Sequence, residues 1–173
     1  MGGLDEMVRG VREVADSLEG MLRSAMEDNP AVEMEMVAMQ KEQLYAGKRS
    51  DGRDITPTMD EDPFFRTQDA AMRYMLRKRQ RFATNPFDAM RKFNVPNLIL
   101  STGLFHSGFY VDFGPDAVKM CNDQGVPNER GILVDVYSKY GQETFGLTDE
   151  NWDLLMRRDV VPQLRERIMQ KIS

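Results

Sequence analysis

Few side chains in this sequence could carry out catalysis, and they do not combine into a recognisable catalytic set. The single histidine, His106, is followed directly by Ser107. Adjacency in sequence does not make a dyad, because catalytic partners are recognised by their geometry in space. A lone histidine beside an aromatic residue, here Phe105, is most often structural. We therefore predict a structural role for His106 and a protein that is not an enzyme.

The glycines Gly103 and Gly108 have the spacing of a phosphate-binding loop. The chain continues with Phe109 and Tyr110, where such a loop requires Lys and then Ser or Thr. The charge that binds phosphate and the hydroxyl that binds Mg²⁺ are both missing. The sequence therefore predicts no nucleotide site at this position.

Metal and redox chemistry are equally restricted by the residues present. The single cysteine, Cys121, cannot form an internal disulfide, and one Cys with one His cannot build a typical zinc site. We expect Cys121 to be a small buried residue on a strand. The acidic triplet Asp60, Glu61 and Asp62 is typical of a solvated turn. We predict no cofactor and no metal, with a carboxylate-based metal enzyme as an open alternative.

The composition limits the class of protein further. The 173 residues include 23 Lys and Arg against 28 Asp and Glu, a net charge of −5, which argues against a strongly basic nucleic-acid binder. The charged N-terminus lacks the apolar core of a secretory signal, and no apolar run is long enough to span a membrane. We expect a soluble chain made in the cytoplasm. The 14 Met residues suit either adaptable packing against neighbours or a core that uses methionine as filler.

The elements that position these residues begin with a helix predicted by a heptad pattern. Apolar residues recur at alternating spacings of four and three: Leu4, Val8, Val11, Ala15, Leu18, Leu22 and Ala25. Asn29-Pro30 then predicts a cap and the start of a second helix that reaches Tyr45. We expect the two helices to form an αα-hairpin. The heptad face would dock on the protein's own core or on a neighbouring subunit, and a two-stranded coiled coil is the alternative.

Turn-forming residues predict an extended loop or small hairpin after the second helix. Asp51-Gly52 is a turn signal, and Pro57 and Pro63 argue against a helix. Structureless loops of this length are uncommon in compact domains, so we expect the segment to lie across a partner or its own surface.

A third helix, predicted from Thr67 to Phe82, ends in the densest basic cluster of the chain. The cluster comprises Arg77, Lys78, Arg79 and Arg81. Cations near a helix C-terminus are favoured by the backbone dipole, by about 0.3–1 kcal/mol each. The alternative interpretation is a surface that faces phosphate groups or an acidic partner.

Beyond Pro96 the pattern alternates, which predicts strands. We expect a helical turn at Asn85-Pro86 before them, a short apolar run at 98–100, and then strands at 109–113, 118–120 and 132–136. These three strands would form a small antiparallel sheet with one face packed on helices.

A final helix completes the predicted fold. Thr148 should cap this helix, and Pro162 should kink it near Asp159. The predicted fold class is α+β, with N-terminal helices, a small antiparallel sheet and C-terminal helices. We expect a single domain, 1–173, with an N-terminal helical arm (1–46), an extended loop (47–66) and an α+β core (67–173).

Three stretches in a set order carry a family resemblance. They are Leu44–Pro57 with Asp62-Pro63-Phe64-Phe65, then Pro96–Phe109, and then Phe145–Thr148 leading to Trp152. Together they resemble small structural proteins of tailed bacteriophages, including crAss-like phages. The second stretch is similar to the entry into the first long strand of neck and tail-completion proteins, and the third to the junction before their last helix. The N-terminal heptad helix has no counterpart in those proteins.

The resemblance implies a virion structural protein, assembled in the host cytoplasm. It would form a homo-oligomeric ring at the head–tail junction, as a neck, connector or tail-completion protein that contacts portal, connector or tail proteins. The candidate interface residues are Leu4, Val8, Val11, Leu18, Leu22, Arg77, Lys78, Arg79 and Arg81. The basic cluster would face the DNA channel or an acidic neighbour, and the loop at 47–65 is a further candidate contact. The alternative is a non-enzymatic host-interaction or regulatory adaptor that acts through the amphipathic N-terminal helix.

Overall fold

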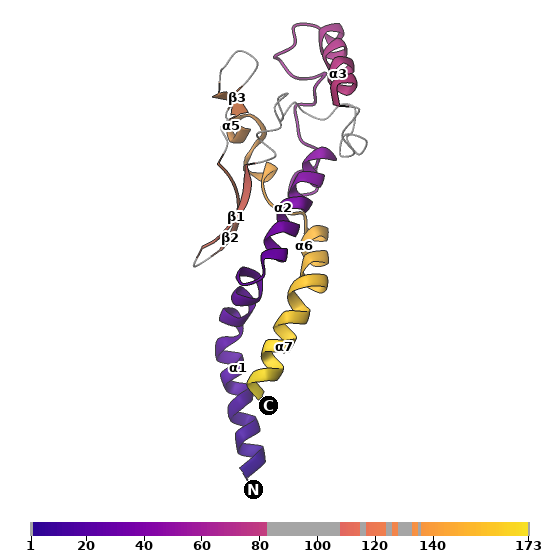
Figure 1. Cartoon of the computed structure of the whole chain (residues 1–173). Coiled ribbons are helices and arrows are strands. Elements are labelled where there is room, and N and C mark those ends of the chain that lie inside the picture. Colours follow the sequence, from indigo (N-terminus) through magenta and orange to yellow (C-terminus); the bar gives the residue numbers. More distant parts are fainter. Residues whose placement is uncertain are drawn as a thin grey trace. The chain divides into compact units, whose positions relative to one another are not determined.

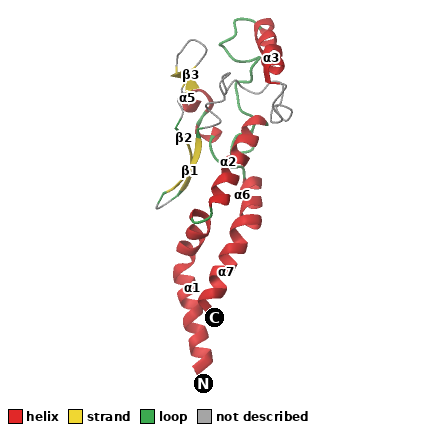
Figure 2. Cartoon of the chain, viewed as in Figure 1, coloured by secondary structure: helices red, strands yellow, loops and turns green. Residues whose placement is uncertain are grey.

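The computed structural model describes residues 2–82, 108–114, 117–123, 126–127, 133–134 and 136–172. Helices occupy both ends of the chain, and short antiparallel strands lie between them in sequence (Figures 1 and 2). This arrangement confirms the predicted α+β class. The chain forms two compact units, one made of residues 1–36 and 150–173 and the other of residues 37–149. The prediction of a single domain stays a prediction.

The first unit begins with two helices whose limits follow local sequence signals. Helix α1 spans Gly2–Glu27, and α2 spans Pro30–Tyr45 and continues into the second unit. The Oδ1 of Asn29 accepts a hydrogen bond of 3.1 Å from the backbone N–H of Ala31, as expected of a capping residue. The predicted start and end of the second helix are therefore confirmed.

The partner of α1 is α7 (Val161–Ile172) and not α2, so the predicted αα-hairpin is wrong. Asp28 donates to Ser24 at 3.0 Å at the end of α1, and Val32 donates to Asn29 at 2.9 Å at the start of α2. The first turns of α2 lead on from the end of α1 without folding back along it (Figure 1). Helix α7 runs beside α1 (Figure 1).

The C-terminal helices accommodate a proline through a π-helical turn. Helix α6 (Asp149–Leu155) passes into the π turn η3 (Met156–Val160), where the N–H of Val161 bonds the carbonyl of Met156, five residues earlier. Pro162 has no N–H, and in an α-helix its ring would crowd the carbonyl four residues earlier. The wider π turn relieves that crowding. The structure therefore has a π turn where the sequence predicted a kink or restart.

In the second unit, the segment after α2 forms a small hairpin, one of the two forms predicted. Lys48 and Asp54 form an isolated antiparallel bridge, and the N–H of Arg49 donates to the carbonyl of Arg53 at 2.8 Å. Ile55 and Met59 are buried. The segment therefore packs against its own unit.

Helix α3 and one β-hairpin follow the predicted pattern. Helix α3 spans Gln68–Phe82, within one residue of its predicted start. Strand β1 (Phe109–Phe113) pairs antiparallel with β2 (Val118–Asn122), so that Val111 lies opposite Met120. Both of these side chains are buried while Tyr110 is exposed, as the alternation predicted.

The third predicted strand is present at Leu133–Val134, but its predicted place in the sheet with β1 and β2 is wrong. Strands β3 (Val126–Pro127) and β4 (Leu133–Val134) form a separate pair, and helix α5 (Val136–Tyr140) begins where the strand was expected to continue. Because Pro127 has no N–H to donate, it limits the extent of this ladder. A 3₁₀ turn, η2 (Gln142–Thr144), follows α5. The predicted helical turn at Asn85-Pro86 and the apolar run at 98–100 lie outside the described residues.

Candidate functional site

The apolar residues of the heptad pattern, Leu4 to Ala25, form a stripe along α1. This stripe is exposed along the first part of the helix. The exposed fractions are 47% for Val8, 55% for Val11 and 44% for Leu18. Leu22 is half-buried, and Leu4 lies in α1 with its side chain outside the described part of the structure. The candidate interface residues of α1 that are described therefore form a line of solvent-facing or half-buried apolar side chains.

Helix α7 covers a different face of α1. The Nζ of Lys171 donates to the Oγ of Ser17 at 2.8 Å, and the Nη1 of Arg167 donates to the Oγ of Ser24 at 2.6 Å. These two serines are seven residues apart, so they share one face, which lies roughly a third of a turn from the apolar stripe. These polar contacts join α7 to α1 and leave the stripe exposed from Val8 to Leu18, whereas Ala25 at its end is buried.

An ion pair between Arg167 and Asp28 completes the contacts between α1 and α7. The Nη2 of Arg167 lies 3.0 Å from the Oδ2 of Asp28. The hydrogen bond from the Ser24 hydroxyl, and after it the bond from Arg167, hold the pKa of Asp28 below its ordinary value. The contacts thus favour the ionised carboxylate.

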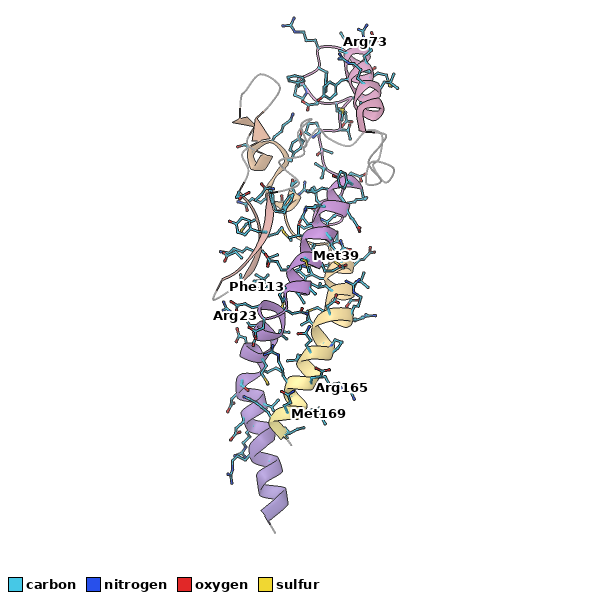
Figure 3. The ribbon with its side chains drawn as sticks, viewed as in Figure 1. Arg23, Met39, Arg73, Phe113, Arg165 and Met169 are labelled. Carbon is cyan, nitrogen blue, oxygen red and sulfur yellow. The ribbon has the colours of Figure 1, made fainter. Side chains whose placement is uncertain are left out.

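Helix α7 contributes exposed apolar residues that the sequence interpretation did not select as a site. The exposed fractions are 47% for Val161, 53% for Met169 and 44% for Ile172, and Figure 3 shows Met169 and Arg165 on this helix. Spacings of eight and three residues place the three on one side of the helix. These helical spacings are the sequence signal from which this exposed face of α7 could have been predicted. A second set at helical spacing on α7 comprises Leu164, Ile168 and Ile172, of which the first two are half-buried.

The basic cluster lies in the last turns of α3. Arg77 is exposed, whereas the side chains of Lys78, Arg79 and Arg81 lie outside the described part of the structure. One turn before Arg77, Arg73 pairs with Asp69 at 2.7 Å, and both side chains are exposed. The position of the cluster at a helix C-terminus fits both the dipole interpretation and an acidic or phosphate-bearing partner.

The acidic triplet is only partly the solvated turn that was predicted. Asp60 and Glu61 are exposed, but the Asp62 side chain is 3% exposed and its Oδ2 lies 2.5 Å from the Nζ of Lys139. Burial, with a contribution from the Asp62 charge, raises the pKa of the neighbouring Tyr140. A carboxylate is buried at low cost only when it is paired and hydrogen-bonded. Lys139 supplies that partner, so the pair joins the loop to α5.

Two buried glutamines of α2 were missed by the sequence interpretation. Gln40 is fully buried and Gln43 is 5% exposed, and both bind backbone groups between Thr144 and Thr148. Their only sequence signal is that they lie one helical turn apart, between buried apolar neighbours. Their role is to fix this segment, so they are structural residues.

Of the residues considered for chemistry, Cys121 and the acidic triplet lie in the described part of the structure. Cys121 lies opposite Tyr110 on the paired strands and is half-buried, so the expectation of a buried thiol is wrong. The charge of Cys121, more than burial, raises the pKa of Tyr110. His106 and Ser107 lie outside the described residues. Among the described residues, no three His, Cys, Asp or Glu side chains gather as a metal site would require.

Within the described ranges, no helix combines the length and apolar character needed to cross a membrane. Comparison of the chain with protein-family models, with curated proteins and with solved structures gives no match.

Proposed function

We propose that this chain is a virion structural protein of a tailed phage, one subunit of an oligomeric ring at the head–tail junction. The proposal places it in the neck, in the connector or at tail completion, assembled in the host cytoplasm and then part of the particle. The three stretches that resemble such phage proteins support it. The proposal assigns no catalytic, cofactor-binding or metal-binding residue.

The observation that carries the proposal is the exposed stripe of α1. Val8, Val11 and Leu18 are each more than two-fifths exposed, although they belong to one continuous heptad pattern. Contiguous exposed apolar surface marks sites of association. A subunit of an assembly buries such a stripe against a neighbour, which here is another copy or a portal, connector or tail protein.

The basic end of α3 is the second proposed contact. Arg77 is exposed in the last turns of the helix, and three further basic residues follow it within four positions. In a chain of net charge −5, this local excess of positive charge favours an acidic neighbouring protein or the phosphates of packaged DNA.

The test replaces the cluster in a virus that encodes the chain. With Arg77, Lys78, Arg79 and Arg81 all changed to Gln, we expect a folded chain with an unchanged melting temperature but particles whose heads and tails fail to join. A control variant removes four exposed basic residues elsewhere, Arg9, Arg53, Lys119 and Arg157. If the variant with the four changes gave normal particles, the basic cluster would not be an interface. If the chain were absent from purified particles, the virion function itself would be contradicted.

The adaptor interpretation uses the same stripe in a different way. An amphipathic helix can lay its apolar face into a groove of a partner protein. A purified chain that is strictly monomeric and captures one host protein tightly would favour an adaptor over a ring subunit.

A further inference from the structure

The exposed apolar residues of α1 and α7 lie on the same side of this helix pair. The helices are antiparallel, because Ser17 contacts Lys171 while Ser24 contacts Arg167. On each helix, the apolar line lies roughly a third of a turn beyond the residues that make the polar contacts between the helices, counted in the direction of the chain. Ile172, at the near edge of the line on α7, also lies beside Gly10 of α1. Two antiparallel right-handed helices turn in opposite senses when viewed from one end, so both lines point to one face.

We propose that a second copy of this chain covers that face, with its α1 antiparallel to the first α1. The edge of the stripe away from α7 carries Arg12 and Glu19, which are seven residues apart and opposite in charge. Both are exposed, and the ion pairs found within the described ranges include neither of them. They occupy the position beside the heptad seam that sets pairing and orientation in helix dimers.

The charges fit one antiparallel alignment of the two stripes. When Val11 lies opposite Leu22 of the second copy, Arg12 comes within about 3 Å, along the helix axis, of the second copy's Glu19. Long side chains span that offset. The two-fold axis repeats the contact, so one alignment creates two identical ion pairs.

The other alignments that keep the apolar residues interleaved are disfavoured or gain nothing. If the second copy slides by one heptad towards the N-terminus of the first helix, Arg12 faces the other Arg12 and Asp5 faces Glu19. If it slides by one heptad the other way, Glu19 faces the other Glu19. A parallel pair places Met7 and Val14 across from the two charges and makes no ion pair. Like charges that oppose each other exclude wrong registers, so the pattern selects the antiparallel dimer.

This pairing goes beyond the proposed function, because it concerns one contact and holds for the purified chain alone. A two-fold contact joins two copies and does not close a ring, which requires a second, head-to-tail interface. Ring closure would then fall to another surface, such as the loop at 47–66 or the basic end of α3.

Sedimentation equilibrium of the full chain tests the pairing through charge exchange. We expect the wild type to be a dimer and Glu19→Arg to weaken it about tenfold or more, because both ion pairs become like-charge contacts. The exchanged variant, Arg12→Glu with Glu19→Arg, should recover the wild-type constant to within about threefold. Glu13→Arg, the same change in charge on the opposite side of α1, should leave the dimer unchanged. A monomeric wild type at about 100 μM, or an exchanged variant as weak as Glu19→Arg, would overturn the proposal.

Disulfide cross-linking tests the orientation in a Cys121→Ser background. A mixture of Val11→Cys chains and Leu22→Cys chains should form mixed cross-linked dimers. Val11→Cys alone should not cross-link, since the two cysteines would be about 16 Å apart along the axis, beyond disulfide reach. Efficient cross-linking of Val11→Cys to itself would show a parallel pair and overturn the proposed register.

Discussion

The backbone N–H of Gly146 donates a hydrogen bond of 2.7 Å to the Oε1 of Gln40, 106 residues away in sequence. The Nε2 of Gln40 in turn donates to the carbonyl of Thr144 at 3.1 Å. One turn later, Gln43 donates to the carbonyl of Gly146 and accepts from the N–H of Thr148, both at 2.9 Å. Two side-chain amides thus bind this segment as a neighbouring strand would, and they satisfy backbone groups that burial would otherwise leave unpaired.

Replacing Gln40 with Met should destabilise the protein markedly. The substitution keeps a similar volume but leaves the N–H of Gly146 and the carbonyl of Thr144 without this partner, and a buried unsatisfied group costs about 1–3 kcal/mol. We expect the free energy of unfolding, from urea titration, to fall by about 2 kcal/mol or more. Glu42→Gln, at an exposed position of the same helix, should change it by less than about 0.5 kcal/mol. Equal effects of the two variants would show that these hydrogen bonds contribute nothing.

Gly146→Ala and Gly20→Ala should change stability in opposite directions. Gly146 has a φ of 107°, which an L side chain rarely adopts, so alanine there should cost about 1–3 kcal/mol. Gly20 lies within α1, and a Cβ there would meet no atom within 4 Å, so alanine should stabilise the helix by about 0.5–1 kcal/mol. Urea titration of both variants gives the two signs directly. A neutral Gly146→Ala would mean that this segment relaxes without cost.

The Lys139→Met variant should lose about 3 kcal/mol of unfolding free energy, because it leaves the buried Asp62 carboxylate uncompensated. Adding Asp62→Asn to Lys139→Met should recover most of that loss, since the unpaired charge is then gone. Arg73→Met is the matched control: it breaks the exposed pair with Asp69 and should cost less than about 1 kcal/mol. If both Met variants behave alike in urea titration, the Asp62 pair is no more important than a surface pair.

Local signals in the sequence were sufficient for the limits of α2 and, to within one residue, of α3, but not for contacts between residues far apart in the chain. Asn29-Pro30 specifies where α2 begins because the cap and the proline act within one turn. The partner of α1 depends instead on the contacts of Arg167, which lies far away in sequence. The heptad spacing identified the apolar stripe, but its exposure follows from which face α7 covers. Gln40 carries no periodic signal, because a polar residue on a helix is normally assigned to solvent.

The stability that Asp28 contributes should depend on pH in the acid range. Its hydrogen bond from Ser24 and its pairing with Arg167 hold the folded-state pKa below the ordinary value of 3.8. A carboxyl group whose pKa is lowered on folding stabilises the protein fully above its unfolded pKa. That contribution is lost as the pH falls through the lowered folded-state pKa. Asp28→Asn should therefore be less stable than the wild type at pH 7, and the difference should shrink below about pH 4.

Thermal unfolding of both proteins between pH 2.5 and pH 7, roughly the range in which carboxyl groups titrate, measures this difference. Added salt should reduce the difference at pH 7, because Asp28 is exposed and exposed charges are screened. Asp16→Asn, an exposed carboxylate of the same helix, is the control and should give a difference near zero throughout. A gap between Asp28→Asn and the wild type that stays constant down to pH 2.5 would contradict the linkage, because ionisation of Asp28 would then play no part in holding α7 beside α1.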